Sequence, residues 1–505
     1  MASYYEPLPD QWIRLMSIHP ANYHQDVTIS ITAVPLLEDS PPTYEALSYV
    51  WGTEDDLVLM TVESSTGPAS QLSVTQNLLV AVKHLRLVDK PRTMWIDALC
   101  INQSDEDEKG PQVARMGIVY RLAARVVVWL GPEENDSDRA MTLIADLSDA
   151  SKAPGAVEQL KSSTDPPFPP VFRLILRPWF DRLWIRQEIR LGNSQSMVLI
   201  GTQTLLWSQF CAGLKRLWLV MWQETSKHTE LILRLGSLEG LLFAPPFLDF
   251  SNLRQHCGRT LCRDPRDRIY AVLSLLHGAD RLEIRPDYTR SVKQVYLDVL
   301  RQHVCQSRDV GFLASCEWLE EPSLPSWIPD FKIRAKGLGE VLPEFHRAHG
   351  LVFGSDTAVL SDGRLRTTGV LVDQIKTLEP FNFRPAANST SDLLIHVLGI
   401  TNAEEAQIPL ILGNTLLKKY ARGPSGGLFS GSFGHLPHAT LFEDLGSAVE
   451  CLRRLHGENR GSLTEQEQDI LTPLLRSAEF YLGTGQILHS EKGDGGLAGG
   501  APQAW

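Results

Sequence analysis

TMWIDALCI, residues 93–101, is a short apolar run that predicts a strand buried inside a sheet. Two other runs have the same β-branched and aromatic character, YEALSYVWGT (44–53) before it and RVVVWLG (125–131) after it. Between these runs lie 75–87 and 104–124, which repeat apolar residues at helical spacing. Buried strands that alternate with helices are typical of a parallel sheet with helices on its faces. The sequence therefore predicts an α/β fold.

An acid follows in RPWFDRLWIRQEIRLG (177–192), which we expect to form one helix. On a 3.6-residue period Glu188 falls on the apolar stripe that contains Trp184. No Lys or Arg lies three or four residues from Glu188, so the same helix offers it no countercharge. Its partner is then either a ligand or an arginine from elsewhere in the fold, such as Arg125 or Arg182.

Charge and composition limit the function classes. The net charge is −12 and there is no long basic run, which argues against a nucleic-acid surface and against a polybasic membrane patch. No apolar stretch nears the roughly 18 residues of a membrane helix, and residues 1–20 do not resemble a signal peptide. The seven cysteines are few and odd in number, which indicates free thiols in a reducing compartment. We expect a soluble cytoplasmic protein without a metal site.

The length of 505 residues predicts two to four folding units. We expect a mainly helical region after the sheet, then a mixed α/β part with a hairpin around the Ser-Asp-Gly turn at 361–363. The predicted organisation is an N-terminal segment 1–43, a sheet domain 44–205, a helical region 206–335, a mixed α/β region 336–490 and a disordered tail 491–505.

Three blocks stand out together: YEALSYVWG (44–52), WIDALCINQSDEDEKGPQV (95–113) and RLWIRQE (182–188). In this order and at this spacing they closely resemble the fungal heterokaryon incompatibility (HET) domain, over roughly residues 40–205. DPRDRIYAVL (264–273) and LPSWIPDF (324–331) are similar to segments that often follow this domain. The resemblance implies an effector of nonself recognition that leads to programmed cell death. The C-terminal end departs from the family pattern.

HET domains are in turn similar to TIR domains, which have a flavodoxin-like α/β fold and some of which cleave NAD at the nicotinamide–ribose bond. In those enzymes a Trp and a Glu four residues later line the pocket, and Trp184 and Glu188 match this arrangement. The resemblance implies NAD as a substrate, with no bound cofactor, and activity after self-association. Loss of the nicotinamide builds a cation on the ribose, which an ionised Glu188 would stabilise. Trp184 would stack on a ring, although a helical Trp is as often a core residue.

Further candidate binding residues come from the ends of the first two predicted strands. Asp97 is expected at the end of its strand and Asn102 in the following loop, near the crevice where α/β sheets bind ligands. Hydrogen bonds that cap this loop are at least as good an explanation for both residues. Glu108 is a further acid, which we interpret as part of a solvated helix start.

The other candidates, at the end of the first strand and the start of its loop, are Ser48, Tyr49, Trp51 and Gly52, where the glycine permits a tight turn or a close approach to phosphate. Two alternatives to an NAD-cleaving effector stay open: a non-catalytic module for signalling and assembly, and a HET-like protein recruited to a metabolic pathway.

Overall fold

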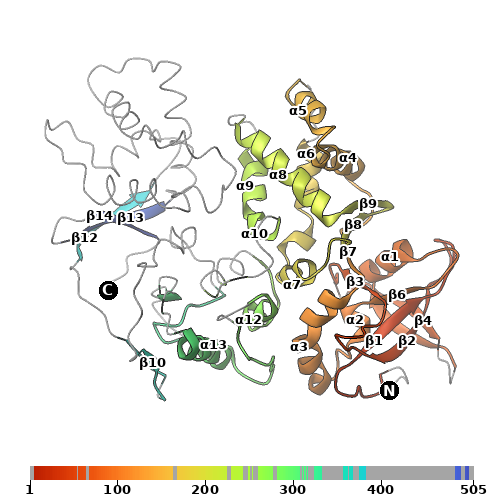
Figure 1. Ribbon diagram of the computed structural model, residues 1–505, viewed down its shortest axis with the longest axis horizontal. Coiled ribbons are helices and arrows are strands. Elements are labelled where there is room, and N and C mark those ends of the chain that lie inside the picture. The colour runs from red at the N-terminus through yellow and green to blue at the C-terminus, as the bar shows by residue number, and fades with distance from the viewer. Residues whose placement is uncertain are drawn as a thin grey trace. The chain divides into compact units, whose positions relative to one another are not determined.

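The computed structural model describes residues 5–53, 55–63, 68–162, 168–223, 229–242, 260–276, 281–307, 324–332 and 357–367 except 362, with isolated residues between 248 and 316 and the strands 375–382, 484–490 and 495–499. The chain divides into two compact units, Met1–Ser307 and Arg308–Trp505. The first unit contains the whole large sheet and is the one that matters for the site (Figure 1).

The centre of the large sheet is parallel. Its strands are β3 (Glu45–Ser48), β6 (Arg92–Trp95), β7 (Arg125–Trp129) and β8 (Met197–Ile200), arranged in the order β6-β3-β7-β8. The chain forms β3 first, places β6 on one side of it and β7 on the other. This is the flavodoxin-like order 2-1-3-4, and the point where the direction of winding reverses lies between β3 and β7. The α/β class expected from the sequence is confirmed.

Further strands extend the sheet on both sides. On the β6 side these are β1 (Trp12–Ile18) and β2 (Thr28–Pro35), followed by β4 (Leu57–Glu63) and β5 (Ser70–Thr75), and β9 (Gln203–Leu206) flanks β8. All of these strands pair in antiparallel fashion except β4 with β2, which run parallel to one another. The full order is β5-β4-β2-β1-β6-β3-β7-β8-β9, so the sheet is mixed. Strands β1 and β2 both belong to the N-terminal segment, and β1 pairs with β6, so this segment is part of the same sheet as the HET-like blocks.

Helices lie on both faces of this sheet (Figure 1). Helix α1 (Gln76–Leu85) begins as predicted, because the side chain of Thr75 caps it by accepting from Leu78 N. Helix α3 (Glu106–Leu122) is capped by Asp105, whose carboxylate accepts from the amides of residues 107 and 108. The other α-helices described in the first unit are α2 (Asp97–Cys100), α4 (Ser137–Ser148), α5 (Ala153–Ser162), α6 (Phe168–Ile175), α7 (Ile185–Arg190), α8 (Trp207–Gln223), α9 (Thr229–Ser237), α10 (Glu239–Leu242), α12 (Asp267–Tyr270) and α13 (Val292–Ser307).

The single helix expected over 177–192 is wrong. The segment forms a 3₁₀ turn, Pro178–Asp181, and then α7, with Arg182 to Trp184 between them. The break has a non-local cause: Leu183 N donates to the carbonyl of Leu261, and Leu261 N donates to the carbonyl of Asp181. A backbone that pairs with another segment cannot continue its own helical hydrogen bonds.

The second unit contains the predicted hairpin. Strands β10 (Ala358–Val359) and β11 (Leu365–Arg366) pair in antiparallel fashion around Gly363, whose φ of +83° suits the turn. Strands β12 (Ile375–Asn382), β13 (Thr484–Ser490) and β14 (Gly495–Gly499) form a separate antiparallel sheet. Within the tail 491–505, which we expected to be disordered, 495–499 is therefore a strand, since a backbone ladder does not require apolar side chains. The rest of that tail lies outside the described residues.

No helix among the described residues combines the length and the apolar character that a membrane crossing requires.

Candidate functional site

Three of the candidate residues, Ser48, Asp97 and Glu188, come together at one edge of the parallel core. Ser48 ends β3, which borders the reversal point of the sheet, and Asp97 follows the end of β6 beside it. Helix α7, which carries Glu188, contacts both β3 and β7. In doubly wound sheets ligands bind beyond the carboxyl ends of the strands at such a reversal point. The residues therefore lie where this fold class places its binding sites.

Glu188 is at the centre of a closed hydrogen-bond network. Its side chain is 1% exposed, and Oε2 accepts a hydrogen bond from Ser48 Oγ. The guanidinium of Arg182 donates to Oε2 over 3.4 Å and to Oε1 over 3.3 Å. Ser48 Oγ in turn accepts from Trp179 Nε1 over 2.9 Å, and both of these residues are fully buried. Both carboxylate oxygens of Glu188 are thus occupied by the protein itself.

Of the two kinds of partner that the sequence left open for Glu188, a ligand or an arginine, the structure shows an arginine. The partner is Arg182, one of the two arginines that the sequence suggested, and it comes from the irregular segment just before α7. The other one, Arg125, pairs with Glu45, which Arg92 also contacts. A buried carboxylate requires a countercharge or hydrogen-bond donors, and here it has both.

A second carboxylate lies beside this network. Asp97 is 8% exposed, and its Oδ2 accepts from Trp51 Nε1 over 2.8 Å. Trp51 itself is 39% exposed, so its indole connects the buried acid to the surface. Tyr49 is buried between the two groups, and its hydroxyl has no hydrogen-bond partner within the described part of the chain. Asp97 begins the short helix α2 rather than ending the strand, because β6 stops at Trp95.

The electrostatics follow from two buried acids and one guanidinium. Burial raises the pKa of Glu188 above its ordinary value, the charge of Arg182 opposes this rise and Asp97 adds to it. Burial likewise raises the pKa of Asp97, against the effect of Arg182. Burial acts against the charge of Arg182, but the two carboxylates together raise its pKa. Arg182 thus interacts with both Glu188 and Asp97. When both acids are ionised, the three side chains together carry a net charge of −1.

The NAD hypothesis expects Trp184 to stack on a ring of the substrate, but in the structure its indole contacts Asp267. Its Nε1 donates to Asp267 Oδ2 over 3.2 Å, and Asp267 belongs to the segment that follows the sheet domain. Trp184 and Glu188 are nevertheless joined by one turn of backbone, because Glu188 N donates to the carbonyl of Trp184. The two residues share an element, but their side chains take part in different contacts.

The remaining candidates shape loops. Asn102 Oδ1 accepts from the amide and the hydroxyl of Ser104, as expected for a side chain that caps its loop. Gly52 has a φ of +86°, and a Cβ there would lie 3.3 Å from Asn77 Cβ. The turn beside the start of α1 therefore accounts for a glycine at position 52.

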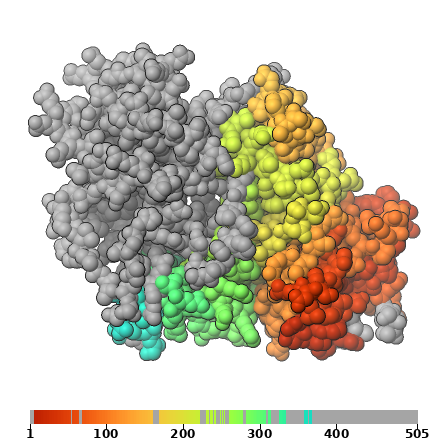
Figure 2. Space-filling view, viewed as in Figure 1, coloured from red at the N-terminus to blue at the C-terminus, as the bar shows by residue number. Residues whose placement is uncertain are grey.

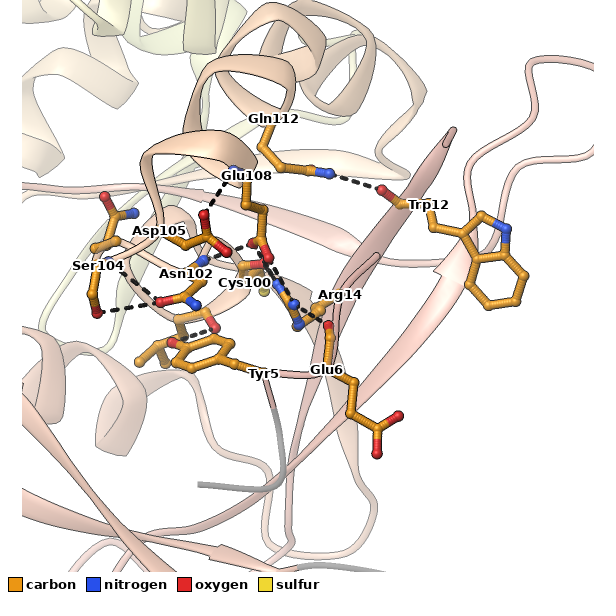
Figure 3. Close-up of polar contacts among 12 residues, drawn as sticks. Tyr5, Glu6, Trp12, Arg14, Cys100, Asn102, Ser104, Asp105, Glu108 and Gln112 are labelled. Carbon is orange, nitrogen blue, oxygen red and sulfur yellow. Dashed lines mark hydrogen bonds and ion pairs between the residues drawn. The ribbon is translucent and has the colours of Figure 1, made fainter. Parts of the chain in front are cut away.

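The interpretation of Glu108 as part of a solvated helix start is wrong. The side chain of Glu108 is 8% exposed, and both oxygens accept from the buried Arg14. Figure 3 shows the two side chains facing one another, with Tyr5 beside the guanidinium and Asn102 next to the carboxylate. Glu108 also accepts from Asn102 N, so this ion pair fixes the loop that follows α2 and Asp97.

Sequence reasoning missed three residues that define the surroundings of the site: Trp179, Asp267 and Arg14. Trp179 and Arg14 contribute donors from fully buried side chains, and Asp267 is 83 residues from its partner Trp184. Only a tertiary structure reveals such contacts. Within the described residues no group of His, Cys, Asp and Glu side chains has the arrangement of a metal site.

Comparison with known proteins agrees with the motif assignment. Residues 44–188 match the family model described as heterokaryon incompatibility protein (HET). The chain is also similar to heterokaryon incompatibility protein 6, OR allele, of Neurospora crassa, with 28% identity over 414 residues. That match covers 65% of this chain and 58% of the relative, so the chain spans a little over half of that protein. No solved structure matches the chain.

Proposed function

Since residues 44–188 of this chain form a HET domain, we propose that the protein is an effector of fungal nonself recognition. The observation that supports this most strongly is a convergence of the three sequence blocks. The first supplies Ser48, the second Asp97 and the third Arg182 with Glu188, and all four meet at the reversal point of the sheet. Blocks that are far apart in sequence thus form a single cluster of Ser48, Asp97, Arg182 and Glu188, which we call the Glu188 centre.

In this proposal the centre works as a rigid core for signalling and assembly. Ser48 ties Glu188 to the end of β3, and Arg182 ties it to the segment paired with Leu261. The position of α7 is therefore fixed by buried polar contacts, which are specific in direction and costly to leave unpaired. Such a core holds the surrounding surface in one shape, as contact with a second copy or a partner protein requires. The downstream result in the cell would be the death response of incompatibility.

Cleavage of NAD is a second candidate, favoured by the placement of an acid at the ligand-binding edge of the fold. The C–N bond between nicotinamide and ribose would break with its electron pair leaving on nicotinamide. Water would then add to the ribosyl carbon and release a proton. Glu188 would stabilise the ribosyl cation. The state described here has Glu188 closed off by Arg182 and Ser48, so this activity requires the network to open.

The two candidates are separated by one pair of assays. The purified full chain is incubated with NAD and nicotinamide is measured, and the same chain is induced in a fungal host while growth is followed. Wild type, Glu188→Gln and Asp146→Ala are compared at matched folded abundance. Asp146 of α4 is a control carboxylate, which pairs with Lys152. Growth arrest without nicotinamide release supports the signalling module. If the wild type releases nicotinamide and Glu188→Gln does not, the result supports the enzyme. If induction of the wild type does not slow the growth of the host, the result contradicts the proposed role.

A further inference from the structure

Asp267 connects the HET domain to the chain that follows it. Its side chain is 8% exposed, and its two oxygens have different partners. Oδ2 accepts from Trp184 Nε1 over 3.2 Å, at the start of the helix that carries Glu188. Oδ1 accepts from Tyr288 OH over 2.8 Å. Residue 267 lies well beyond the end of the family match at 188, so this link crosses the domain boundary.

The same downstream segment packs on α3. Lys109 Nζ lies 5.2 Å from the centre of the Tyr288 ring, whose other close cation is Arg266 at 5.3 Å. A Cβ added at Gly117 would come within 2.6 Å of Ser274 Cβ, which shows how tightly the two backbones approach. In Figure 2 the green surface of this part of the chain adjoins the orange surface of the HET domain.

We propose that residues 264–276 and 281–290 are a clasp, which holds α7 of the HET domain in its closed position through the contact of Asp267 with Trp184. Opening of the clasp would free the start of α7, and with it the segment from which Arg182 reaches Glu188. The clasp thus gives the chain beyond the HET domain control over the Glu188 centre. This inference rests on the proposed role of that centre, but its test does not depend on any activity.

The charge environment gives the clasp a pH dependence. Burial raises the pKa of Asp267 to about 6, while the hydrogen bonds from Tyr288 and Trp184 lower it. Of the other charged groups around it, Asp264 raises this pKa and Lys109 of α3 lowers it. A carboxyl that becomes exposed on opening returns to its ordinary value near 4, so the closed state binds the proton more tightly. Protonation therefore favours closure, and a pH above about 6 favours opening.

The clasp is tested by hydrogen exchange, read by mass spectrometry on the full chain. Trp184→Phe keeps an aromatic side chain but replaces the indole by a smaller ring, and so removes the N–H that donates to Asp267. Gly117→Ala inserts a methyl group against Ser274 without touching Asp267, and Ser274→Gly in that background removes the clash. We expect each single variant to speed exchange about tenfold in peptides of both α7 and 264–290, since loss of one buried contact changes opening by roughly that factor. The added Ser274→Gly should restore protection.

Asp146→Ala serves as the control, because it removes a carboxylate that has no contact with the clasp. Peptides of β3 and β7 report global unfolding and should keep their wild-type protection. After correction for intrinsic rates, the wild type should exchange more slowly in both peptides at pH 5.5 than at pH 7.5. The proposal is overturned if exchange rises in 264–290 while α7 stays protected, or if β3 and β7 lose protection together with α7. Neither result bears on the role in nonself recognition, which the growth assay tests.

Discussion

The guanidinium of Arg182 contacts both carboxylate oxygens of Glu188 beside the end of β3. The distances are 3.4 Å from Nη1 to Oε2 and 3.3 Å from Nη2 to Oε1. The exposed fractions of the two side chains are 19% and 1%. An ion pair in such a setting contributes little over an apolar pair of the same shape, but loss of one partner alone is strongly destabilising. This asymmetry leads to a direct test of the pair.

Arg182→Gln should lower the free energy of unfolding by about 3–5 kcal/mol, because it leaves Glu188 buried without a countercharge. Glu188→Gln added to this variant should restore most of the loss. The measurement is a double-mutant cycle by chemical denaturation. Additive effects of the two substitutions would contradict an energetic link between these side chains.

Ser48→Ala should destabilise the fold by about 1–3 kcal/mol, since it removes a donor to Glu188 and leaves Trp179 Nε1 buried without its acceptor. Ser73→Ala, in the exposed part of β5, is the matched control and should have little effect. The check is the denaturation midpoint of each variant at constant slope. Equal midpoints for the two variants would show that the serine contact is not important.

Glu108→Ala should cost about 3–5 kcal/mol, because it strips the buried Arg14 of its carboxylate. Two residues earlier, Glu106 is exposed and contacts Lys109 only at 3.8 Å, so Glu106→Ala should change stability by less than about 0.5 kcal/mol. Thermal unfolding of the two variants distinguishes the buried pair from the surface pair. A Glu108 effect as small as that of Glu106 would contradict the arrangement in Figure 3.

The stability of the fold should depend on pH through Asp267. Its pKa in the folded state is about 6 against 3.8 for the free group, so the folded chain binds the extra proton between these values. The contribution of this carboxyl is therefore fully present below pH 3.8 and is lost as the pH rises through 6, on the order of 3 kcal/mol in all. The loss between pH 5 and 7 is measured by urea unfolding and should be reduced in Asp267→Asn. An unchanged pH profile in that variant would assign the dependence to other groups.

Local patterns in the sequence were enough to predict the α/β class, because each pattern identifies its strand or helix without reference to distant residues. Thr75 caps α1 through its neighbour Leu78, and the apolar runs of β3 and β7 indicate buried strands. The flanking strands β1, β4 and β5 were missed. Leu57 and Leu59 of β4 are exposed, so this strand is no buried apolar run, and its place in the sheet depends on distant partners.

The candidate site was predicted in part. The motif blocks pointed to Ser48, Asp97 and Glu188, and the structure brings all three to one edge. The choice between Arg125 and Arg182 as the partner of Glu188 could not be made, since it depends on the pairing with Leu261 that breaks the expected helix. The contact of Trp184 with Asp267 spans 83 positions, and no local spacing encodes it.

The central claim, that the Ser48–Glu188–Arg182 network is the working centre of a nonself-recognition effector, is tested most directly by induced expression in a fungal host. The measurement is the fraction of cells that survive, with the amount of folded protein matched between variants. We predict that the wild type and Asp146→Ala kill, and that Arg182→Gln and Glu188→Gln each abolish killing. Killing by Glu188→Gln at the wild-type level would contradict the account.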